Sequence, residues 1–102
     1  MIVPMLSIGG KGVISVLANV CPKETHDMCQ LYFDGKVKES AELQIKYMDL
    51  VGSLFCDVNP IPVKAAMNLL GYAAGDVRLP LENLSAANVE RLKASMKNVG
   101  II

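Results

Sequence analysis

The sequence predicts a mainly α-helical chain with one buried strand, of the kind found at the end of a larger α/β protein. Its 102 residues suffice for a single domain. Four stretches repeat apolar residues at helical spacing, whereas the run Val13–Leu17 is β-branched and does not alternate apart from Ser15. Such a run is typical of a parallel strand that is buried on both faces. A lone strand has unpaired backbone groups on both edges, so we expect it to pair with another chain or to have lost its partner strands.

The region before the predicted strand is apolar and then rich in glycine. Periodicity does not separate a short strand from the end of a helix over Ile2–Ile8, and both interpretations stay open. Gly9, Gly10 and Gly12 predict a tight turn, because glycine reaches positive φ without steric cost.

Four helices are expected after the strand. Pro22 suits the first turn of one helix and Gly35 suits its end, while Ser85 is a plausible N-cap for the last helix. The expected helices run from Pro22 to Gly35, from about Val37 to Phe55, from Pro62 to Gly71, and from Ser85 to Gly100.

The second of these helices carries two apolar lines. We expect burial on more than one of its sides, because a single core-facing stripe would need only one line. The lines are Ala41, Ile45, Met48, Phe55 and Leu43, Tyr47, Leu50, Leu54.

Composition excludes several classes of function. Ten basic and ten acidic residues cancel, and no basic tract indicates a nucleic-acid partner. No segment approaches the about 20 apolar residues of a membrane span, and Lys11 interrupts the N-terminal apolar run that a secretion signal would need. Three cysteines without a CxxC pair favour a reducing compartment, so we expect a cytoplasmic protein.

The candidate chemical motifs do not assemble into a site. A phosphate loop needs its lysine after the last glycine and a helix to follow, but Lys11 precedes Gly12 and a strand is expected next. Cys21, His26 and Cys29 lack a fourth metal ligand. We therefore predict no metal, no cofactor and no catalytic residue within the chain.

A lysine that acts as a Schiff-base nucleophile must be desolvated, because desolvation lowers the pKa of its amine. Only Lys64 has apolar neighbours on both sides in the sequence, and a buried stem with a solvated ammonium group is the favoured interpretation even there.

Three stretches together resemble the dihydrodipicolinate synthase (4-hydroxy-tetrahydrodipicolinate synthase) family. The run Gly9–Val20, GGKGVISVLANV, is similar to that family's last barrel strand. Asn59–Lys64, NPIPVK, is similar to the motif that opens one of its C-terminal helices, and Arg78–Leu81, RLPL, is similar to its ending. The resemblance covers essentially the whole chain.

The resemblance implies a TIM (β/α)8 barrel followed by a helical C-terminal extension, usually in a homo-oligomer. Residues 1–36 would be the end of the barrel, with its last strand and helix, and residues 37–102 the helical extension. It implies a lyase of lysine biosynthesis that joins pyruvate to aspartate semialdehyde through a Schiff base. The main-chain carbonyl of Ile14 would line the pyruvate pocket, at the end of a barrel strand where such barrels hold their chemistry.

The family's catalytic lysine and its other catalytic groups lie upstream of the matching region. We therefore expect a fragment or a piece of a split enzyme that is inactive alone. Two alternatives stay open: an aldolase similar to N-acetylneuraminate lyase within the same superfamily, and a non-catalytic helical module for oligomerisation or interaction.

Overall fold

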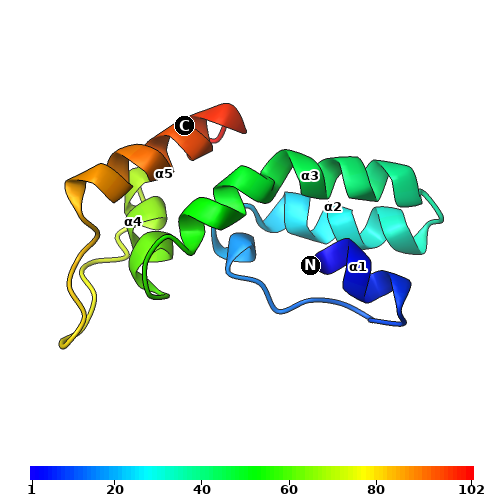
Figure 1. Ribbon diagram of the computed structural model, residues 1–102, viewed down its shortest axis with the longest axis horizontal. Helices are drawn as coiled ribbons and strands as arrows, with labels where there is room; N and C mark the ends of the chain where they lie inside the picture. The colour runs from blue at the N-terminus through cyan, green and yellow to red at the C-terminus, as the bar shows by residue number, and fades with distance from the viewer. The chain divides into compact units, whose positions relative to one another are not determined.

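The computed structural model describes residues 1 to 102 and contains five α-helices, one short 3-10 helix and no β-strand (Figure 1). The chain divides into two compact units, Met1–Met48 and Asp49–Ile102. None of the helices combines the length and the apolar character that crossing a membrane requires. The elements are α1 (Ile2–Ser7), η1 (Leu17–Asn19), α2 (Pro22–Phe33), α3 (Val37–Leu54), α4 (Ile61–Leu69) and α5 (Ala86–Asn98).

The four predicted helices are confirmed as α2 to α5, but the predicted strand over Val13–Leu17 is wrong. Residues 13–16 are irregular, and Leu17 begins the 3-10 helix η1. The physical reason is that a strand obtains its hydrogen bonds from a neighbouring strand, and no other segment of this chain is a strand. β-Branched composition alone therefore does not produce a strand here.

The N-terminal unit is built around α2. The first residues form a helix rather than a strand, since α1 spans Ile2–Ser7. Both α1 and η1 pack on α2. The core of the unit includes the buried residues Leu6, Met28 and Tyr47. The hydroxyl of Ser40, at the start of α3, donates a 2.6 Å hydrogen bond to the Met28 carbonyl oxygen. A buried polar group is thus satisfied where α3 meets α2.

The C-terminal unit packs α4 on α5. The buried hydroxyl groups of Ser53 and Ser95 lie 2.6 Å apart and share a hydrogen bond. Ser85 is confirmed as the N-cap of α5, because its side chain accepts a hydrogen bond from the Asn88 amide. The fully buried apolar side chains of this unit include Leu50, Leu54, Ala66, Leu92 and Met96.

Helix α3 is buried along only one of its two apolar lines. Tyr47, Leu50 and Leu54 are buried, whereas Ile45 and Met48 are 65% and 60% exposed. The expectation of burial on more than one side is wrong for the chain by itself, because no element of the chain covers the other line.

In the glycine turn after α1, the backbone of Gly10 lies close to the backbone of Met5. The Gly10 amide donates to the Met5 carbonyl oxygen at 2.9 Å, and a Cβ at Gly10 would lie 2.8 Å from the same oxygen. We expect Gly10→Ala to lower the free energy of unfolding by about 1–3 kcal/mol, because backbone must move to relieve this overlap. Urea unfolding followed by circular dichroism measures the change.

Gly12→Ala is the matched control, because a Cβ at Gly12 meets nothing within 4 Å. We expect it to change the free energy of unfolding by no more than about 0.5 kcal/mol. Equal losses in the two variants would contradict the close approach at Gly10.

Candidate functional site

The segment between α1 and η1 contains the residue expected to line a substrate pocket. The segment begins at Gly9, whose φ of 101° is a conformation that glycine adopts without steric cost. It ends where the Ala18 amide donates a hydrogen bond to the Ser15 carbonyl oxygen at 3.3 Å. Between these points, the backbone groups of residues 11–14 make no hydrogen bond within the chain. The Ile14 side chain is fully exposed. The Ile14 carbonyl oxygen is therefore a free acceptor.

An open groove of about 380 Å³ lies between this segment and α2. Lys11 and Val13 line it from the segment, while His26, Cys29 and Phe33 line it from α2. The structure thus brings Lys11 to the same groove as two of the residues that the sequence offered as metal ligands.

The chemistry of this groove is limited. His26 and Cys29 make no hydrogen bond to each other, so the groove lacks the contact that pairs a nucleophile with its base. Burial raises the pKa of Cys29, which lowers its thiolate fraction. No three His, Cys, Asp or Glu side chains of the chain lie close enough together to hold a metal ion. The groove has the character of an uncovered surface beside a helix.

Cys21 lies in the interior, at the start of α2. It is 1% exposed, and burial together with the nearby Glu24 carboxylate raises the pKa of its thiol to about 11. Burial is also the main cause that raises the pKa of Tyr47, with Glu24 adding to it. Cys21 is thus a structural thiol that stays protonated at neutral pH.

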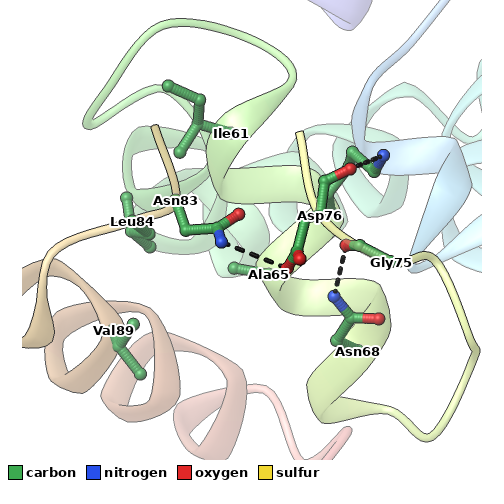
Figure 2. Close-up of a pocket in the computed structure, with 9 residues that line it drawn as sticks. Ile61, Ala65, Asn68, Gly75, Asp76, Asn83, Leu84 and Val89 are labelled. Carbon is green, nitrogen blue, oxygen red and sulfur yellow. Dashed lines mark hydrogen bonds between the residues drawn. The ribbon is translucent and has the colours of Figure 1, made fainter. Parts of the chain in front are cut away.

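A second hollow, of about 140 Å³, lies in the C-terminal unit between α4, α5 and the irregular stretch that joins them (Figure 2). Ile61, Leu84 and Val89 give it apolar walls. Figure 2 shows Asn83 directed at the Asp76 carboxylate and Asn68 directed at the Gly75 carbonyl oxygen, as the dashed hydrogen bonds indicate.

These hydrogen bonds hold the irregular stretch against α4. The Lys64 ammonium group donates to the Asp76 carbonyl oxygen at 2.7 Å, and the Asn68 amide donates to the Gly75 carbonyl oxygen at 3.0 Å. Asn83 donates to the Asp76 carboxylate at 3.1 Å. Lys64 therefore ties the irregular stretch to α4.

Sequence reasoning missed Asn68, which both donates to Gly75 and accepts from the Ala74 amide at 3.0 Å. The one signal for it was an amide side chain at the end of a helix, shortly before a glycine-containing irregular stretch.

Comparison with known proteins identifies the family. The model of the "Dihydrodipicolinate synthetase family" matches residues 1–99, and the chain belongs to this family. The chain is 54% identical over 101 residues to the 4-hydroxy-tetrahydrodipicolinate synthase of Clostridium tetani. This match covers 99% of the chain and 34% of the relative, so the chain spans about a third of the length of the curated relatives it matches.

Solved structures show the same relationship. Dihydrodipicolinate synthase from Thermotoga maritima matches with a TM-score of 0.95 and 43% identity, over 98% of this chain and 34% of that one. The enzyme from Cyanidioschyzon merolae, solved with lysine bound, matches with a TM-score of 0.95 and 39% identity, over 98% of this chain and 34% of that one. These neighbours are TIM barrels, and the chain corresponds to their C-terminal segment.

The buried thiol of Cys21 gives a direct test of the core of the N-terminal unit. A pKa of about 11 in place of 9.0 leaves about a hundredfold less thiolate at pH 8. We expect iodoacetamide to alkylate Cys21 in the folded chain at least about a hundredfold more slowly than in the chain unfolded in urea. Mass spectrometry of tryptic peptides measures the two rates.

The same raised pKa sets the sign of a pH dependence. The unfolded chain releases the proton of Cys21 first as pH rises, so the free energy of unfolding falls between pH 9.0 and about 11. Cys21→Ala should remove this part of the slope. Alkylation of native Cys21 as fast as in urea would contradict both expectations.

Proposed function

We propose that the chain is the C-terminal segment of a pyruvate-dependent Schiff-base lyase of the 4-hydroxy-tetrahydrodipicolinate synthase type. The reaction would condense pyruvate with aspartate semialdehyde in lysine biosynthesis, in the cytoplasm. The observation that carries the proposal is the match of nearly the whole chain to relatives with this name, at 50% to 54% identity for the first two.

Within that enzyme, residues 1–36 would complete the barrel and residues 37–102 would form the helical extension. The Ile14 carbonyl oxygen would line the pyruvate pocket. Its lack of a partner within the chain supports this role, because a free acceptor at the end of a barrel strand can face a substrate.

The chain by itself would be inactive. A Schiff-base lysine needs a desolvated amine that loses its proton near neutral pH, and no lysine of this chain is buried. Lys64, which is half-buried, already donates its hydrogen bond to the Asp76 carbonyl oxygen. The nucleophile would come from the two thirds of the family's length that this chain does not span.

Two alternatives have less support. An aldolase of the N-acetylneuraminate lyase type would share the glycine-strand motif, but the first relatives are all named synthases. A helical interaction module that assembles as a homo-oligomer is favoured by the uncovered apolar line of α3, with Ile45 and Met48 exposed.

A steady-state assay tests the proposal. We expect the 102-residue chain, given pyruvate and aspartate semialdehyde, to show no turnover above the buffer background. The full-length Clostridium tetani relative in the same assay is the positive control, and a chimera of that relative carrying this chain in place of its C-terminal third should turn over. Turnover by the chain alone, or an inactive chimera that is folded, would contradict the proposal.

A further inference from the structure

We propose that Asn19 is a positioning residue for the pyruvate pocket, because its side chain holds the turn that follows Ile14. The choice of pyruvate as the ligand rests on the proposed function. The hold on the turn rests on hydrogen bonds within the chain itself. Asn19 acts through the backbone and does not touch the substrate.

The Ile14 carbonyl oxygen is held only through its neighbours in the chain. The backbone groups of residues 11–14 make no hydrogen bond within the chain, and the first anchor before them is the Gly10 amide. After Ile14 the anchor is closer, because the carbonyl oxygen of the next residue, Ser15, accepts from the Ala18 amide. The turn after Ile14 therefore contributes most to the orientation of its carbonyl group.

Val16 is the residue at which the chain enters this turn. Its φ of −62° and ψ of −39° are helical, and its carbonyl oxygen accepts two hydrogen bonds from one residue. The backbone amide and the side-chain Nδ2 of Asn19 both donate to it, each at 3.1 Å. Hydrogen bonds in a 3-10 turn have poorer geometry than those in an α-helix, so a second donor adds a larger share of the turn's stability.

The Asn19 side chain is exposed, so burial does not force it onto the backbone. Asparagine side chains form such local bonds to a carbonyl three residues earlier, and these bonds organise turns. The other side of the turn is fixed to α2. The Cys21 amide donates to the carbonyl oxygen of buried Leu17 at 2.8 Å, and the Thr25 hydroxyl donates to the Cys21 carbonyl oxygen at 2.8 Å. Asn19 thus connects Val16 to a fixed support.

Loss of the Asn19 side chain would leave the Val16 carbonyl oxygen with one donor and allow the Ile14 carbonyl group to change its orientation. A group that orients a small substrate is effective only while it is held in the productive geometry. Loss of one hydrogen bond of this kind changes an equilibrium by about threefold to tenfold. The affected substrate is pyruvate, because Ile14 is assigned to the pyruvate pocket.

Three variants separate positioning from folding. Asn19→Ala removes the side-chain donor, whereas Asn19→Ser keeps a hydroxyl donor that can reach a carbonyl three residues earlier. Asn83→Ala is the matched control, because it also removes an exposed amide that donates at 3.1 Å, but in the C-terminal unit. Each variant is made in the chimera of the Clostridium tetani synthase that carries this chain as its C-terminal third.

Steady-state kinetics of the chimeras measure the effect on each substrate. We expect Asn19→Ala to raise the KM for pyruvate about threefold to tenfold, and to change kcat and the KM for aspartate semialdehyde by less than about twofold. Asn19→Ser should recover most of the loss, and Asn83→Ala should leave both KM values unchanged. A merely structural role would lower the folded fraction, and therefore kcat, without this split. An original chimera that is folded but inactive would contradict the proposed function and not the hold on the turn.

Amide hydrogen exchange of the 102-residue chain tests the hold on the turn without turnover. Relative to the intrinsic rate of each sequence, Asn19→Ala should speed exchange of the amide of residue 19 about threefold to tenfold, and Asn83→Ala should not.

Four results would each overturn the positioning role. They are an unchanged pyruvate KM in the active Asn19→Ala chimera, an equal rise in both KM values, no recovery with Asn19→Ser, and unchanged exchange at residue 19. Unfolding of the chimera by Asn19→Ala would also overturn it, because the side chain would then be needed for folding rather than for position.

Discussion

The rest of the structure depends on one constraint, which is that backbone amides and carbonyls must find hydrogen-bond partners. A helix meets the constraint within its own segment, whereas a strand depends on residues elsewhere. Helices α2 to α5 therefore form in this chain, whereas residues 11–14 are left without partners. The unpaired segment and its flanking turns follow from the same rule.

The same constraint accounts for the unusual surface. The chain is 52% hydrophobic, yet Ile45, Met48 and Phe55 beside α3's buried line and the side chain of Ile14 face water. Lone apolar residues on a surface are ordinary, but a line of them on one helix is more than chance exposure and is the kind of surface that the proposed larger enzyme would cover. The groove beside α2, with His26 and Cys29 on its wall, fits this view better than it fits a catalytic centre.

Much of the helical part could be predicted from the sequence, because its signals are local. Pro22 begins α2 and Ser85 caps α5. Gly35 and Gly100 each have a positive φ and lie just after the end of a helix. The strand prediction failed because a strand takes its hydrogen bonds from a neighbouring strand, which the local composition of residues 13–17 does not report. The hydrogen bond from Asn68 to the Gly75 carbonyl oxygen could not be predicted either, because it depends on how the irregular stretch after α4 folds back against that helix. The family was recognised from three short motifs, and the comparisons confirm it over residues 1–99.

Amide hydrogen exchange of the 102-residue chain at low concentration measures whether the backbone amides of residues 12–14 have hydrogen-bond partners. We expect the amides of residues 12–14 to exchange at nearly the rate of an unstructured peptide, and amides in the middle of α2 and α3 to be strongly protected. Protection of residues 12–14 equal to that of the helices would contradict it, because the segment would then already have partners within the chain.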